Sequence, residues 1–160
     1  MAGVCQLTSP LPHAIIAVPE LLMSVGLNEV VMTVILVVDD NPQMAELIQE
    51  MVQIAGYETE VAYSGLEGLD KAREGMPDLI LVDLMMPDID GWEVYHKLRE
   101  FSTIPVIFVT AYNTPQNQAK AEKMGAAGFI GKDLTPMMLA QQIQFVLDEQ
   151  GGKQRREYLH

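Results

Sequence analysis

Short runs of apolar residues alternate along this chain with longer segments whose apolar residues recur at helical spacing. From Thr33 onward the alternation repeats five times. This pattern is typical of a parallel sheet, because a crossover helix must follow each strand before the next parallel strand can begin. It predicts an α/β fold with five strands, at residues 34–38, 58–62, 79–82, 106–109 and 128–130.

The strands differ in how their apolar residues are spaced. Residues 34–38, 79–82 and 106–109 are apolar on successive positions, as expected for central strands that helices cover on both faces. Residues 58–62 alternate between polar and apolar, which predicts a strand near an edge of the sheet.

Helix-start signals follow the first two strands. Asn41 can cap a helix that begins at Pro42, because proline is well suited to the first helical position. Ser64 and Glu67 match a capping box at the start of the second helix. In the first helix the spacing predicts these inward residues: Met44, Leu47, Ile48, Met51, Val52 and Ala55.

Three further helices complete the pattern. A helix is predicted at 91–100, with Val94, Tyr95 and Leu98 inward. The next, at 115–124, is largely polar. The last is predicted to begin at Thr135-Pro136 and to end near Glu149.

The chain divides into one folded domain and two terminal segments. Residues 32–149 are predicted to form the domain, and 150–160 a solvated tail. Residues 1–31 are mostly apolar and contain proline. Two interpretations of this leader stay open: a poorly ordered or loosely docked extension, or the product of an upstream start.

Composition limits the possible partners. The formal net charge of −12 argues against nucleic acid or an anionic membrane as partner, since both demand clustered Lys and Arg. A single cysteine, Cys5, cannot build a disulfide framework or a cysteine-based zinc site within one chain. No apolar run reaches the roughly 18 residues of a membrane span. Residues 1–31 also lack the basic region of a signal peptide, so we expect a cytoplasmic protein.

Polar residues follow four of the five predicted strands. Asp39 and Asp40 follow the first strand, Asp83 the third, Thr110 the fourth and Lys132 the fifth. Ligands of open parallel sheets bind at the carboxyl ends of the strands. Crowded carboxylates repel one another unless a cation is present, and Mg²⁺ prefers such oxygen ligands. Each residue alone would be more typical of a turn or a surface charge, but together they form the set that a phosphoryl-transfer site needs.

Four blocks of sequence carry a family resemblance. The segments "ILVVDDN", "LILVDLMMPDIDGWEV", "VIFVTAY" and "GFIGKD" resemble the receiver domain of bacterial two-component response regulators, from about residue 32 to residue 149. The resemblance implies a flavodoxin-like, doubly wound sheet with strand order 2-1-3-4-5 and five helices. With this order, the first and third strands are neighbours and their acids converge.

The resemblance also implies roles for the residues at the strand ends. Asp83 would accept a phosphoryl group from a sensor histidine kinase or a histidine phosphotransfer protein. Asp40, Asp83 and the Met85 carbonyl would bind Mg²⁺, with Asp39 acting through a bound water. Thr110 would donate its hydroxyl to the phosphoryl group, and Lys132 would pair with its charge.

Further residues match positions that tune or transmit the signal in this family. Phe129 stands at the switch aromatic position, although a core aromatic there is an equally good interpretation. The bulky Met85 and Tyr112 predict slow hydrolysis of the phosphorylated form. The surface of the fourth helix, fifth strand and fifth helix would carry the change to a downstream protein. Trp92 is predicted on a helix surface or partner face.

The sequence departs from the family after the site lysine, where Asp133 replaces a proline that is usually joined by a cis bond. A cis bond before a non-proline residue costs about 3 kcal/mol. Of the two geometries, cis with strain or trans with a shifted lysine, the resemblance favours cis.

Three functions remain open. The first is a stand-alone response regulator that is a phosphoacceptor rather than an enzyme, apart from its own phosphoryl transfer and dephosphorylation. The second is a Mg²⁺-dependent phosphohydrolase of the haloacid dehalogenase type, although the Asp-x-Asp spacing of those enzymes is missing at Asp39-Asp40-Asn41. The third is a receiver-like scaffold that is never phosphorylated.

Overall fold

The computed structural model describes residues 32–158, so the predictions for the leader 1–31 lie outside the described residues. The strands are β1 Val34–Val38, β2 Glu58–Ala62, β3 Leu79–Val82, β4 Val106–Thr110 and β5 Gly128–Gly131. The helices are α3 Pro42–Ile54, α4 Gly65–Gly75, α5 Gly91–Arg99, α6 Pro115–Met124 and α7 Pro136–Tyr158.

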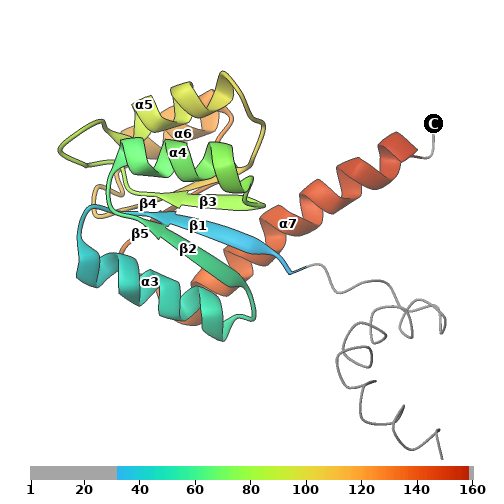
Figure 1. Ribbon diagram of the computed structural model, residues 1–160, viewed down its shortest axis with the longest axis horizontal. Helices are drawn as coiled ribbons and strands as arrows, with labels where there is room; N and C mark the ends of the chain where they lie inside the picture. Colours follow the sequence, from blue (N-terminus) through green and yellow to red (C-terminus); the bar gives the residue numbers. More distant parts are fainter. Residues whose placement is uncertain (1–31, 159–160) are drawn as a thin grey trace, which may run out of the picture. The chain divides into compact units, whose positions relative to one another are not determined.

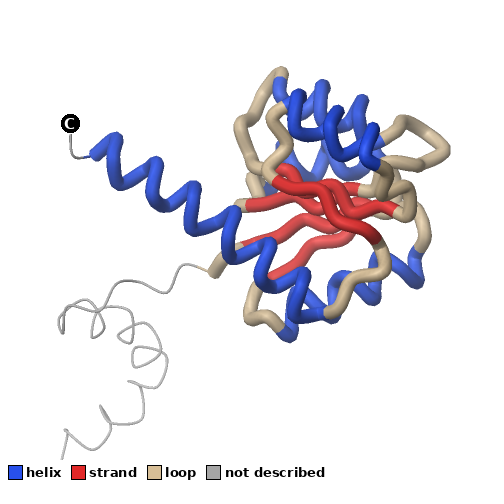
Figure 2. The backbone as a smooth tube through the Cα atoms, turned by 180° about the vertical axis from the view of Figure 1, so that it is seen from behind, coloured by secondary structure: helices blue, strands red, loops and turns tan. Residues whose placement is uncertain are grey.

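The five strands form one parallel sheet in the order β2-β1-β3-β4-β5, which confirms the predicted topology. Helices α4, α5 and α6 cover one face, and α3 and α7 cover the other (Figures 1 and 2). β2 lies at an edge, as its alternating pattern predicted. β3 and β4 are buried along their whole length, which explains their unbroken apolar runs.

Each face of the sheet has its own apolar core. Leu36, Val38 and Phe108 pack with the helices of the α4–α6 side. Ile35, Val37 and Ile107 pack on the other side, together with Ile143 of α7. Alternate residues of a strand point to opposite faces, so the two cores share the same strands and fix the register of the sheet.

The helix starts confirm the predicted caps. The Asn41 side chain accepts from the backbone N–H groups of Gln43 and Met44, at 3.0 and 3.2 Å. The Ser64 hydroxyl accepts from the N–H of Glu67 at 3.1 Å. These bonds satisfy donors that have no partner inside the helix.

Two details of the helices differ from the prediction. Leu47 is 44% exposed, because the core-facing line of α3 runs through Ala45, Ile48 and Val52. α7 continues past Glu149 to Tyr158, beyond the sheet (Figure 1). The prediction that it ends near Glu149 is therefore wrong: Gly151 and Gly152 weaken a helix without breaking it, and no proline follows them.

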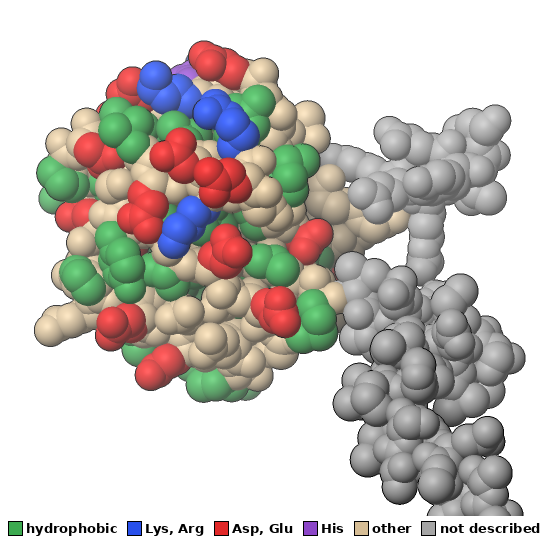
Figure 3. All heavy atoms as spheres, in the orientation of Figure 1, with side chains coloured by type: hydrophobic (Ala, Val, Ile, Leu, Met, Phe, Trp, Pro, Cys, Tyr) green, Lys and Arg blue, Asp and Glu red, His purple; other side chains and the backbone are tan. Residues whose placement is uncertain are grey.

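The surface agrees with the acidic composition. Acidic, basic and apolar side chains are interspersed on the face of the described part that Figure 3 shows. Among residues 32–158, no helix is both long and apolar enough to cross a membrane.

Candidate functional site

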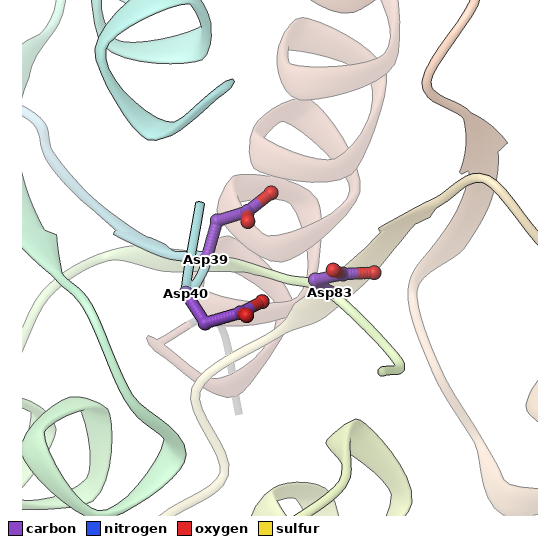
Figure 4. Close-up of side chains that lie close together, drawn as sticks. All are labelled: Asp39, Asp40 and Asp83. Carbon is purple, nitrogen blue, oxygen red and sulfur yellow. The ribbon is translucent and has the colours of Figure 1, made fainter. Parts of the chain in front are cut away.

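The ends of β1 and β3 bring three acids together. Val38 of β1 lies beside Val82 of β3 in the parallel register, so the residues that follow them are neighbours. The N–H of Asp83 donates to the carbonyl of Val38 at 3.0 Å, which continues the ladder past the last strand residue. Carboxylate oxygens of Asp39, Asp40 and Asp83 all lie within 4.8 Å of one another (Figure 4). The predicted convergence is confirmed.

Lys132 reaches this cluster from the end of β5. Its Nζ lies 2.9 Å from Oδ2 of Asp39 and 2.9 Å from Oδ2 of Asp83. The Lys132 backbone N–H donates to the carbonyl of Thr110 at 3.0 Å, which ties the lysine to the end of β4. Lys132 thus pairs with two of the three carboxylates, so the cluster contains more acids than cations.

Burial changes the pKa values of Asp39 and Lys132. Burial raises the pKa of Asp39, although the attraction to the Lys132 ammonium and the hydrogen bond from the Asn41 N–H oppose the rise. Burial acts to lower the pKa of Lys132, but the interactions of its ammonium with Asp39 and Asp83 outweigh this effect. The pKa of Lys132 therefore lies above its ordinary value. Lys132 is thus protonated at neutral pH, as a group that pairs with an anion must be.

The donor set fits a small divalent cation. Three carboxylates supply hard oxygen ligands, and their excess negative charge favours a cation of charge two. Asp39 Oδ2 is buried, and its contact with Lys132 is an ion pair that leaves the oxygen without a well-directed hydrogen bond. Buried polar atoms in folded proteins usually have such a partner, so this oxygen is available to a ligand or a bound water.

Thr110 lies at the end of β4 and is fully buried. Its Oγ1 accepts from the N–H of Tyr112 at 3.1 Å. Thr110 and Lys132 line one hollow of about 380 Å³, together with Ala111, Asn113, Gly131 and Asp133. Thr110 and Lys132, the two residues assigned to phosphoryl binding, therefore border the same space, and none of the three acids lines it.

The described residues contain no cis peptide bond, so the bond between Lys132 and Asp133 is trans. The expectation of a cis bond is therefore wrong. A trans bond avoids the cost that cis imposes on a non-proline residue, and Lys132 still reaches both carboxylates. The exposed Asp133 folds back over Gly131, where a Cβ atom would lie 2.5 Å from its Oδ1.

Of the remaining candidate residues, Met85 adjoins the cluster, since its backbone N–H donates to Oδ1 of Asp83 at 3.5 Å. Met85 and Tyr112 are 55% and 53% exposed. Phe129 is half-buried, with its ring centroid 6.2 Å from that of Phe108. Trp92 is half-buried too, 4.8 Å from Phe108, so it is less of a surface residue than the sequence suggested.

A parallel five-stranded sheet with an acid cluster, a threonine and a lysine at its strand ends defines a receiver-type signalling module. The family model for the response regulator receiver domain matches residues 35–144, and the chain belongs to this family, whose members act in two-component systems.

Relatives and solved structures agree with this assignment. The chain is 38% identical over 104 residues to the polar-differentiation response regulator DivK of Brucella ovis, covering 63% of this chain and 85% of DivK. It is 34% identical to the uncharacterized transcriptional regulatory protein YclJ of Bacillus subtilis, covering 71% of this chain but only 50% of YclJ. A CheY-like receiver domain from Methanospirillum hungatei superposes with a TM-score of 0.71 at 31% identity, covering 77% of this chain and 99% of that domain.

Proposed function

We propose that this protein is a response regulator that accepts a phosphoryl group on Asp83 from a phosphohistidine of a sensor histidine kinase or a histidine phosphotransfer protein. The observation that carries the proposal is the position of Lys132 Nζ, 2.9 Å from both Asp39 and Asp83, beside three acids that lie within 4.8 Å of one another. A mere structural ion pair would need one acid for one lysine. The surplus acids point to a site that binds a cation and an incoming anion.

Asp40, Asp83 and the carbonyl of Met85 would hold Mg²⁺, with Asp39 acting through a bound water. When bound, Mg²⁺ supplies positive charge that offsets the repulsion between the carboxylates and the phosphoryl oxygens. Asp40 is the most accessible of the acids, whereas Asp39 and Asp83 are 1% and 6% exposed. The two buried acids are thus held in place, and the open side remains for the incoming group.

The side chains of this chain perform the transfer by positioning and charge. An oxygen of Asp83 attacks the phosphorus, the P–N bond to the donor imidazole breaks, and an acyl phosphate forms. Lys132 shifts from two carboxylates to the new phosphoryl oxygens, which offer more charge in the same place. Thr110 donates its hydroxyl to a phosphoryl oxygen and is then drawn toward Asp83.

This movement of Thr110 provides a switch. Phosphorylation replaces the single negative charge of the Asp83 carboxylate with nearly two on the phosphoryl group, and the displaced threonine leaves space that the Phe129 ring can occupy. Phe129 lies on β5 and carries no polar atom that burial would leave unpaired. The surface of α6, β5 and α7 would pass the change to a downstream protein.

We propose that the protein acts in the cytoplasm on protein partners. The net charge of −12 disfavours nucleic acid or a membrane as partner.

Hydrolysis of the phosphorylated form should be slow. Met85 and Tyr112 are bulky, largely exposed and close in sequence to the acceptor and to Thr110. They can obstruct the approach of water to the acyl phosphate. Met85→Asn should therefore shorten the lifetime of the phosphorylated protein, as followed by intact mass, and an unchanged lifetime would contradict this role.

The decisive experiment is to incubate the protein with Mg²⁺ and acetyl phosphate, and to follow its intact mass. Wild type should gain one phosphoryl group, and Asp83→Asn or added chelator should abolish the gain. Steady release of phosphate from phosphate esters would favour the haloacid dehalogenase alternative. A protein that gains no mass under any of these conditions would favour the scaffold.

A further inference from the structure

The loop of residues 83–90 joins β3 to α5 and carries two of the proposed site residues, Asp83 and Met85. Further along this loop, the Asp88 carboxylate reaches the start of α4. Its Oδ1 accepts from the N–H of Gly65 at 3.2 Å, and its Oδ2 accepts from the N–H of Leu66 at 2.9 Å. Both bonds join segments more than 20 residues apart in sequence.

These bonds complete the hydrogen bonding of the α4 start. Ser64 provides two acceptors of its own: its hydroxyl receives the Glu67 N–H, and its carbonyl receives the Gly68 N–H. The two N–H groups that remain in the first turn are those of Gly65 and Leu66. Asp88 accepts from both, so a carboxylate from another element caps the helix, where the helix dipole also favours negative charge.

Packing beside these bonds is equally close. A Cβ atom on Gly65 would lie 2.5 Å from Cγ1 of Ile89 and 2.9 Å from Cγ2 of Val94. Ile89, the neighbour of Asp88, is partly buried in the core on this side of the sheet. Only glycine at position 65 allows the loop to lie this close to α4.

The far end of the loop is fixed as well. The N–H of Gly91 donates to the carbonyl of Leu84 at 2.8 Å, and a Cβ atom on Gly91 would overlap the carbonyl oxygen of Asp83. The loop is therefore anchored at Asp88 and closed at Gly91. Met85 lies between the acceptor acid and these anchors, and is itself largely exposed.

We infer that Asp88 is a positioning residue: its carboxylate holds the β3–α5 loop against the start of α4 and thereby fixes the backbone that presents Asp83 and the Met85 carbonyl. What it positions rests on the proposed function. Residues that orient metal ligands without touching the metal typically change metal affinity by about tenfold or more when they are replaced. Asp88 acts in this way through the backbone and does not itself reach the cation.

The test compares Asp88→Ala with Ser64→Ala, which is a matched control. Both variants remove a cap from the start of α4, but only Asp88→Ala releases the loop. Two quantities are measured: the Mg²⁺ concentration that gives half-maximal labelling by acetyl phosphate, and the rate of hydrogen exchange at the Gly91 amide in metal-free protein. Asp88→Ala should raise the half-maximal Mg²⁺ concentration about tenfold and speed hydrogen exchange at the Gly91 amide. Ser64→Ala should change the half-maximal Mg²⁺ concentration by less than about twofold.

Asp88→Asn keeps one acceptor oxygen and should fall between wild type and Asp88→Ala, which provides a test even if the alanine variant folds poorly. Equal effects of Asp88→Ala and Ser64→Ala on both quantities would overturn the inference, because Asp88 would then be only a helix cap. If wild type is not labelled, the proposed function fails. The exchange rate at Gly91 would still show whether Asp88 holds the loop.

Discussion

Gly91→Ala is the most direct perturbation of the acceptor loop that leaves every proposed site side chain intact. Gly91 is the first residue of α5 and is buried against the backbone of Asp83 and Leu84. An added Cβ would overlap the Asp83 carbonyl oxygen and lie 2.9 Å from Cα of Leu84. Because these are backbone atoms, no side-chain rotation can relieve the contact.

Two opposing effects set the size of the result. Replacing glycine by alanine in a helix gains about 0.5–1 kcal/mol. Overpacking a tight site typically costs about 1–3 kcal/mol, and a backbone obstacle places this site at the upper end. We expect a net loss of about 2 kcal/mol in the free energy of unfolding, which lowers Tm by about 8 °C for a domain of this size. Labelling by acetyl phosphate should slow at least tenfold, since small misplacements of a reacting group cost up to about 100-fold.

Urea unfolding and intact-mass kinetics measure the two effects. Gly151→Ala is the control, because nothing lies within 4 Å of its added Cβ and α7 is helical there. It should raise stability slightly and leave labelling unchanged. A Gly91→Ala protein that is as stable as wild type and is labelled at the same rate would refute the argument that this helix start sets the position of Asp83.

Three further predictions concern charge and access. Lys132→Met leaves the buried Asp39 carboxylate unpaired, so the free energy of unfolding in urea without Mg²⁺ should fall by about 2 kcal/mol. This loss is smaller than the full cost of breaking a buried pair because the lysine is 17% exposed. Unchanged stability would contradict the ion pair. The pKa of Asp88 lies below its ordinary value of 3.8: burial acts to raise it, but the backbone N–H bonds from Leu66 and others outweigh that effect. The unfolded chain therefore binds more protons than the folded protein as the pH falls below about 4, and stability is lost there. Asp88→Asn should be less stable at neutral pH and show a flatter acid limb in thermal unfolding, and an unchanged slope would refute the assignment. Tyr112→Ala should speed loss of the phosphoryl group several-fold in an intact-mass time course, whereas an equal lifetime would remove Tyr112 from the list of obstructing residues.

Most of the fold could be predicted because the apolar runs are short and well bounded. Three strands match their predicted limits, and β4 and β5 each extend one residue further, to Thr110 and Gly131. Polar or small residues at a strand end give no apolar signal, although the backbone ladder continues through them. The end of α7 was missed for a related reason, since the tail has good helix formers but no apolar periodicity.

The acid cluster could be predicted because strand order and register alone bring Asp39, Asp40 and Asp83 together. The role of Asp88 could not, because its partners are backbone N–H groups that any residue type would provide. The trans bond at Lys132 could not be predicted from the resemblance either, since the family geometry depends on a proline that this chain lacks.

The row of tilted rings formed by Trp92, Phe108 and Phe129 has an optical consequence. Trp92 is the single tryptophan of the chain, and its indole contacts Phe108, which in turn contacts Phe129. The Lys120 ammonium lies over the indole ring, 4.4 Å from its centroid. All indole emission from this protein therefore originates one side chain away from Phe129, and rotation of that ring would be visible in the spectrum of the native protein without any attached dye.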